Sequence, residues 1–148
     1  MARKIPEWVG THANECCKAL GIDDSGITMY YRIKKCGKNE NGDSHMGYCD
    51  SVPRYSYAKI QLAPQVTDDD TGYETLTHEH VHAAVGEWML ACNQLIDLLP
   101  EGLQKHGRDL YEEAMEKCVT RIGKGLAVYL RGQHGTPEST TGQGDQAE

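Results

Sequence analysis

The stretch that decides the fold runs from Thr71 to Gly86 and reads TGYETLTHEHVHAAVG. Apolar residues such as Leu76 and Val81 supply a side that can be buried, as in a helix packed on a core. Thr71 and Glu74 have the spacing of a capping box. We therefore expect a helix to begin at about residue 72 and to continue through the late 80s or into the 90s.

The same stretch contains a metal-binding pattern, His78-Glu79-His80-Val81-His82. His78 and His82 are four residues apart, so on a helix both imidazoles lie on one face and can bind one Zn²⁺ together. Glu79 is rotated by one residue. Its carboxylate can lie beside the open position of the metal and act as general base toward a water whose pKa the metal lowers. His80 lies about 200° around the helix from His78 and is interpreted as a bystander or accessory group.

A catalytic zinc needs a third protein ligand, and the last predicted helix offers three carboxylates. They are Glu112, Glu113 and Glu116. An acidic first turn is favoured by the helix dipole, which explains Glu112 and Glu113 better than Glu116. We favour Glu116 and keep the other two as alternatives; His106, in a loop flanked by glycine, is a weaker candidate.

The chain upstream of the metal pattern is expected to form an N-terminal helix and a small sheet. Helical apolar spacing marks the helix, and β-branched and aromatic runs mark the strands. The expected elements are a helix over residues 7–20 and strands over residues 27–33, 48–51 and 55–62. The turn signal Asn41-Gly42 predicts that the first two strands form a hairpin with a long tip. Strict alternation in the third strand predicts one face on the core and one face exposed.

The chain after the metal pattern is expected to end in a long helix and a tail. Pro100-Glu101-Gly102 and Gly107 predict breaks, and a helix then runs from about Arg108 to Leu130. Its predicted apolar stripe comprises Met115, Val119, Ile122, Leu126 and Tyr129. Residues 132–148 have almost nothing to bury, so we expect a disordered tail after a single domain over residues 1–131.

Three runs of residues resemble a known family. YAKIQLAP (residues 57–64) precedes YETLTHEHVHAAVG (residues 73–86), which is followed by E-x-x-V-x-x-I-G-x-G-L (residues 116–126). Together they resemble the small HExxH zinc metallopeptidases common in bacteriophage genomes, and they are similar to the minigluzincin, SprT-like and ImmA-like groups. The resemblance covers roughly residues 27–130, and the HExxH segment is its specific part.

The resemblance implies an α+β, zincin-like fold. It implies an N-terminal helix, a small antiparallel sheet, an HExxH active-site helix and a C-terminal helix that brings a glutamate ligand. His78, His82 and Glu116 would then hold Zn²⁺, with Glu79 as the general base. Two features depart from the family pattern: residue 80 is His instead of an apolar residue, and the stretch over residues 88–107 is longer than a minimal member needs.

The implied substrate is a peptide or a protein. The exposed edge of the strand over residues 55–62 is expected to align an extended peptide by β-augmentation. The oxyanion needs a hydrogen-bond donor, and Tyr111, Tyr129 and His106 are candidates among which the sequence does not choose.

Composition argues against two classes of partner. The 148 residues carry a formal net charge of −7, and Lys and Arg are scattered, which disfavours binding to nucleic acid. No apolar run approaches the roughly 18 to 20 residues of a membrane span, and no apolar segment typical of a secretory signal follows the basic N-terminus. We expect a cytoplasmic protein, in the host cell if it is encoded by a phage.

Six cysteines raise the question of disulfide bonds. They form no CxxC pair and no export signal accompanies them, so reduced thiols are expected. Cys36, His45 and Cys49 could contribute to a structural zinc site, or Cys36 and Cys49 could form a disulfide. A fourth ligand is missing, so a polar loop with unpaired thiols is the favoured interpretation.

Three hypotheses of function follow. The first is a zinc-dependent metallopeptidase that hydrolyses peptide bonds. The second is a catalytically inactive, zinc-binding zincin-fold protein of a phage, whose role is interaction. The third is a helical binding module in which the histidines match the metal pattern by accident. A third metal ligand and an open zinc position that coexist with Glu79 in a cleft would separate the first hypothesis from the second, and metal analysis would expose the third.

Overall fold

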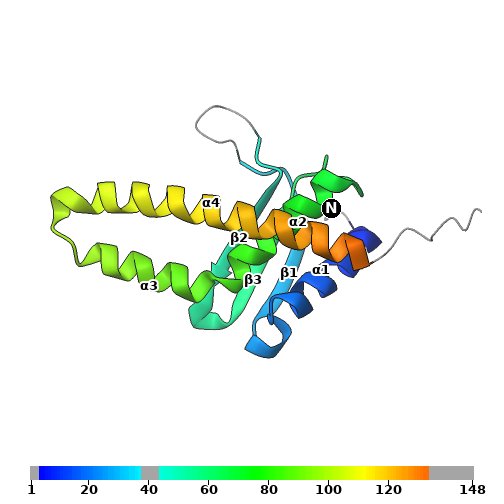
Figure 1. Ribbon diagram of the computed structural model, residues 1–148, viewed down its shortest axis with the longest axis horizontal. Coiled ribbons are helices and arrows are strands. Elements are labelled where there is room, and N and C mark those ends of the chain that lie inside the picture. Colours follow the sequence, from blue (N-terminus) through cyan, green and yellow to red (C-terminus); the bar gives the residue numbers. More distant parts are fainter. Residues whose placement is uncertain (1–3, 38–43, 134–148) are drawn as a thin grey trace, which may run out of the picture.

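The computed structural model describes residues 4–37 and 44–133, and this part of the chain is an α+β molecule (Figure 1). It contains four helices and a three-stranded mixed sheet within the described residues. The helices are α1 (Glu7–Ala19), α2 (Asp70–Ala84), α3 (Gly86–Asp97) and α4 (Glu101–Gln133). The strands are β1 (Thr28–Ile33), β2 (Gly47–Val52) and β3 (Tyr57–Leu62), and short 3-10 turns cover Asp23–Ser25 and Pro53–Tyr55.

The sheet has the strand order β1-β3-β2 and is mixed, not antiparallel. β1 runs parallel to β3, with Met29 opposite Ala58, and β2 runs antiparallel to β3, with Cys49 opposite Ile60. The predicted hairpin between β1 and β2 is wrong, because β3 lies between these two strands. The turn signal Asn41-Gly42 lies outside the described residues.

β3 lies at the centre of the sheet, between β1 and β2, and its alternating apolar residues are covered. Ala58, Ile60 and Leu62 are buried, and the last two pack against Val9 of α1 and Leu76 of α2. The expectation that this strand is an exposed edge is wrong. The edge strand on the side of the HExxH helix is β2, which contacts α2 and pairs only with β3 in the described part of the chain.

The predicted HExxH helix is present, but it differs from the prediction at both ends. The cap at its N-terminus is Asp69, whose side chain accepts a hydrogen bond of 2.8 Å from the Gly72 amide, so the predicted capping box at Thr71 is wrong. The helix ends at Ala84, and α3 begins at Gly86 in a new direction. Gly86 lies directly against β2, since a Cβ there would be 2.2 Å from Ser51 Oγ.

α4 is one uninterrupted helix, so the predicted break at Gly107 is wrong. Its buried face comprises Met115, Val119, Gly123, Ala127 and Leu130, whereas Ile122 and Tyr129 of the predicted stripe are exposed. The face differs because Gly123 allows a close approach to α2 that a larger side chain would prevent. Gly132 and Gln133, predicted as tail, belong to this helix, and the rest of the predicted tail lies outside the described residues.

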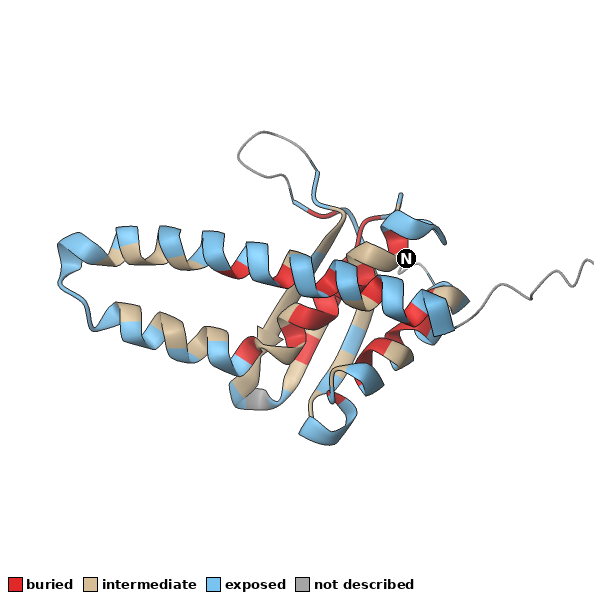
Figure 2. Cartoon of the chain, viewed as in Figure 1, coloured by how far each residue is buried: buried red, intermediate tan, exposed pale blue. Residues whose placement is uncertain are grey.

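α3 and the first part of α4 project from the body as a two-helix arm, which we define as residues 86–114 (Figure 1). Figure 2 shows that the arm is intermediate or exposed almost throughout, with buried residues only where it joins the body. Arg108 and Asp97 form an ion pair of 2.9 Å between its two helices. Within the described residues, no helix is both long enough and apolar enough to span a membrane.

Candidate metal centre

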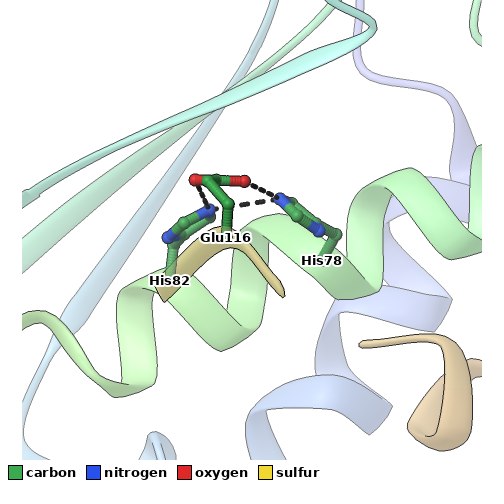
Figure 3. A group of neighbouring side chains, drawn as sticks. All are labelled: His78, His82 and Glu116. Carbon is green, nitrogen blue, oxygen red and sulfur yellow. Dashed lines mark hydrogen bonds and ion pairs between the residues drawn. The ribbon is translucent and has the colours of Figure 1, made fainter. Parts of the chain in front are cut away.

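Three potential metal ligands come together from two helices, His78 and His82 from α2 and Glu116 from α4 (Figure 3). One ligand atom from each lies within 4.8 Å of the others. The Glu116 carboxylate spans both imidazoles, with Oε1 at 3.1 Å from His82 Nε2 and Oε2 at 3.5 Å from His78 Nε2. The two Nε2 atoms are 3.1 Å apart. Two imidazole nitrogens and one carboxylate are a donor set that could hold a metal ion.

The contact between α2 and α4 positions this cluster. A Cβ on Gly123 would lie 3.1 Å from His78 Cα, so the two helix backbones almost touch there. Val81 of α2 packs with Met115 and Val119 of α4 in a buried group. Because Glu116 directly follows Met115 on the helix, the same packing turns its carboxylate toward the two histidines.

Glu116 is the predicted third-ligand candidate that the structure brings to the histidines. Glu113 is exposed and pairs with Lys117 at 2.5 Å, and Glu112 is exposed one turn before Glu116. His106 is ten residues before Glu116, which is about 15 Å along the helix. Neither alternative glutamate nor His106 belongs to the cluster in the described part of the chain.

The charges of the cluster are strongly coupled. Hydrogen bonds to His78 and His82 hold the pKa of the Glu116 carboxyl well below its usual range. The hydrogen bond to Glu116 in turn raises the pKa of His78. A proton on these imidazoles competes with a metal ion for the same nitrogen atoms, so metal binding should weaken as the pH falls.

Glu79 lies beside the three ligands without being one of them. Burial raises the pKa of its carboxyl to about 7, and the neighbouring His78 and His82 oppose this rise. Its side chain is 6% exposed and packs under β2, where a Cβ on Gly47 would be 2.6 Å from Glu79 Oε1. A buried carboxyl with a pKa near neutrality can both accept and release a proton at physiological pH.

His80 lies on the opposite side of α2, as its rotation around the helix predicts. It is completely buried; its Nδ1 lies 2.7 Å from the Leu76 carbonyl oxygen, and its Nε2 lies 2.9 Å from the Tyr31 hydroxyl. Burial lowers the pKa of His80 to about 4. This residue therefore attaches the HExxH helix to β1 and does not take part in the cluster.

A groove passes the cluster along the edge strand β2. Its central part is bounded by the cluster, by Glu79 and by the first residues of β2. It continues on both sides of the cluster. Toward α3 it is lined by residues that include Asp50, Ser51, Met89 and Asn93, and toward the other end by Met46, Thr75, Thr120 and Lys124.

None of the residues predicted to stabilise an oxyanion lines this groove. Tyr129 is 60% exposed and lies about 20 Å along α4 from Glu116. The Tyr111 hydroxyl is buried and has no hydrogen-bond partner among the described residues, and its ring contacts Trp88.

His45 is the groove residue whose role the sequence analysis missed. It lines the groove beside Glu79, just before β2 begins, whereas its spacing to Cys36 and Cys49 indicated at most a structural zinc site. Both cysteines are free, and the three residues form no cluster of potential ligands in the described part of the chain. The pairing of β2 with β3 and a hydrogen bond of 3.0 Å from the His45 backbone amide to the Gly37 carbonyl oxygen hold His45 at the groove. No local sequence signal indicates these contacts.

Searches of the chain against family models, curated proteins and solved structures found no match.

Proposed function

We propose that the protein is a zinc-dependent metallopeptidase with a zincin-like fold. The observation that carries the proposal is the convergence of His78, His82 and Glu116 in a groove that also contains the buried carboxyl of Glu79. Two imidazoles and a carboxylate are a known ligand set of catalytic zinc. An exposed cluster of acidic residues would not include a buried carboxyl poised for proton transfer.

The residues of the groove can perform the steps of amide hydrolysis. Zinc would supply Lewis acidity, which polarises the scissile carbonyl group and makes water a better nucleophile. Glu79, whose buried carboxyl lies in the groove beside the three ligands, takes a proton from the attacking water and passes it to the leaving nitrogen. His45 lies at the same part of the groove and is the candidate donor to the oxyanion.

An extended peptide suits the shape of this groove. β2 forms one wall, and in the described chain only β3 pairs with it, so its other edge can bind a peptide backbone. Hydrogen bonds of that kind recognise the backbone of any sequence and align a scissile bond parallel to the strand. We therefore assign the alignment of an extended peptide to β2, and not to the strand over residues 55–62.

The decisive experiment compares zinc content and peptide hydrolysis in the purified wild type and in Glu79→Gln. We expect about one zinc ion per chain in both proteins, because Glu79 is not a ligand. We expect hydrolysis of a peptide library, followed by mass spectrometry, to fall by about 10²- to 10⁴-fold in Glu79→Gln. Glu113→Gln is the matched control, since this glutamate is exposed and pairs with Lys117.

Two outcomes would contradict the proposal. A wild type that binds no zinc would remove the metal site altogether. A wild type that binds zinc but cleaves no peptide would favour the alternative, a catalytically inactive zincin-fold protein of a phage whose role is interaction.

A further inference from the structure

The arm carries an apolar face that nothing in the described chain covers. Trp88 and Leu95 of α3 are 58% and 65% exposed, and Leu98, the C-cap of this helix, is 81% exposed. Leu103 and Leu110 of α4 are more than half exposed as well. Buried residues in the arm are confined to Gly86, where α3 meets the body (Figure 2). Two helices without a core of their own gain little from packing on each other alone.

The exposed residues form one stripe on each helix. Trp88, Ala91, Leu95 and Leu98 are spaced by three, four and three residues and fall within an arc of about 80° around α3. Leu103, Leu110 and Ala114 fall within an arc of about 40° around α4. Spacing of three and four residues is the pattern by which helices pack into bundles.

Both stripes point to the same side of the arm. Ile96 of α3 lies next to Gly107 of α4 and marks the side of α3 that faces α4. Around the axis of α3, the groove residues Met89 and Asn93 lie on one side of Ile96, and the stripe lies on the other side. The same holds on α4, where Glu116 faces the groove and the stripe faces away from it. The arm therefore presents a two-helix apolar face opposite the groove.

We propose that this face binds the same face of a second copy of the chain, so that two arms form a four-helix bundle. The inference does not depend on the proposed peptidase activity. A two-helix face of matching stripes is self-complementary, as a two-fold contact requires. None of the residues that form the two stripes is charged, so pairing the stripes of two copies brings no unpaired charge to the centre of the contact.

The size of the face supports a reversible dimer. It is about 16 Å long and about 20 Å across, or roughly 320 Å² in projection, and protruding side chains increase its accessible area. Exposed apolar patches of a few hundred Å² mark interaction sites on soluble proteins. With the side chains that flank the stripes, each copy approaches the about 800 Å² of a standard interface. We therefore expect dissociation in the micromolar range.

The test is the mass of the full-length protein in solution, measured by sedimentation velocity from low micromolar to several hundred micromolar concentration. The wild type should shift from monomer to dimer over this range. Leu95→Glu combined with Leu110→Glu should remain monomeric throughout, because both substitutions place a charge in the face. Both positions are exposed, so the monomer should keep its fold, which circular dichroism checks.

The matched control is Val128→Glu, which places a charge on an exposed apolar residue of the same helix outside the arm. It should dimerise like the wild type. The proposal is overturned if the wild type stays monomeric at the highest concentration, in which case the face is bare or binds a different protein. It is also overturned if the double variant dimerises like the wild type, or if the control loses the dimer to the same extent.

Discussion

At the scale of single residues, the contact with Gly47 fixes the position of the carboxyl group of Glu79, the candidate general base. A Cβ at residue 47 would be 2.6 Å from Glu79 Oε1 and 2.9 Å from Thr75 Cγ2. Only a glycine permits this approach, which places the backbone of the edge strand over the carboxyl group. The atoms that a Cβ would meet are side-chain atoms, so a methyl group would displace the carboxylate and leave the helix in place.

Gly47→Ala should therefore impair catalysis more than stability. We expect kcat for peptide hydrolysis to fall by up to about 10²-fold, because a displacement of about 1 Å in a catalytic group has an effect of that order. Zinc content should be unchanged, since the ligands lie elsewhere. Steady-state kinetics and metal analysis check this. Gly37→Ala, which meets no atom within 4 Å, is the control, and equal kcat in the two variants would contradict the argument.

His80 shows how a residue next to the cluster contributes to stability instead. The completely buried imidazole contacts Tyr31 and Leu76 in its neutral form, and its pKa falls from an ordinary value of 6.5 to about 4. The unfolded chain binds a proton at this residue between these values and the folded chain does not. Its contribution to stability is present above pH 6.5 and is lost as the pH falls from about 6.5 to about 4.

We predict that His80→Gln reduces this acid sensitivity. The loss of unfolding free energy on acidification should be smaller than in the wild type by an amount on the order of 3 kcal/mol. Glu79 acts in the opposite direction, because its raised pKa favours the folded state at low pH, so the difference between the two proteins is the informative quantity. Urea denaturation of chelator-treated protein measures it. His106→Gln, on the exposed surface of the arm, should behave like the wild type.

At the scale of elements, the crossing of α2 and α4 determines where the third ligand lies. The two backbones meet at Gly123, where a Cβ would be 3.1 Å from His78 Cα and 3.4 Å from its backbone nitrogen. These are backbone atoms, which cannot move without moving the helix. A larger residue at position 123 would push α4 away and carry Glu116 with it.

Gly123→Val should weaken metal binding although it replaces none of the ligands. We expect zinc affinity to fall by at least about 10-fold, as in metal sites whose supporting residues are altered, with a loss of stability from overpacking of about 1–3 kcal/mol. Competition with a chromophoric chelator and thermal melting measure the two effects. Gly125→Val is the matched control, because it introduces the same side chain into the same helix where no atom lies within 4 Å. Equal zinc affinity in the two variants would show that the crossing does not position the ligand.

Sequence reasoning was most successful where the determinants are local. The N-terminal helix, the HExxH helix and all three strands lie close to their predicted positions, because periodicity and turn residues act within a few residues. The order of the strands was wrong, since pairing β1 with β3 depends on contacts between distant segments. The sequence favoured Glu116 as the third ligand but could not exclude Glu112 and Glu113, because the choice depends on how α4 crosses α2. His45 was missed because its position depends on contacts between distant segments, among them the pairing of β2 with β3.

At the scale of the whole molecule, the proposed zinc ion would connect the two largest helical parts of the protein. α2 belongs to the layer that covers the sheet, and α4 continues from the body into the arm (Figure 1). Their contact includes the buried group of Val81, Met115 and Val119, the close approach at Gly123 and the ligand cluster. At the far end of α4, Arg131 also pairs with Asp70 of α2 and lies over the ring of Tyr73. A metal ion that binds only the folded state should therefore stabilise the molecule as a unit.

Removal of zinc should accordingly lower the melting temperature. With free zinc at a hundredfold excess over its dissociation constant, the stabilisation is about 2.7 kcal/mol, which corresponds to roughly 5–10 °C for a chain of this length. Scanning calorimetry with and without a chelator measures the difference. Glu116→Gln should abolish most of it, whereas Glu112→Gln, on the exposed surface one turn away, should preserve it. The protein concentration must be constant, because association of the arms would also raise the melting temperature. Identical melting with and without the chelator would mean that no ion connects the two helices.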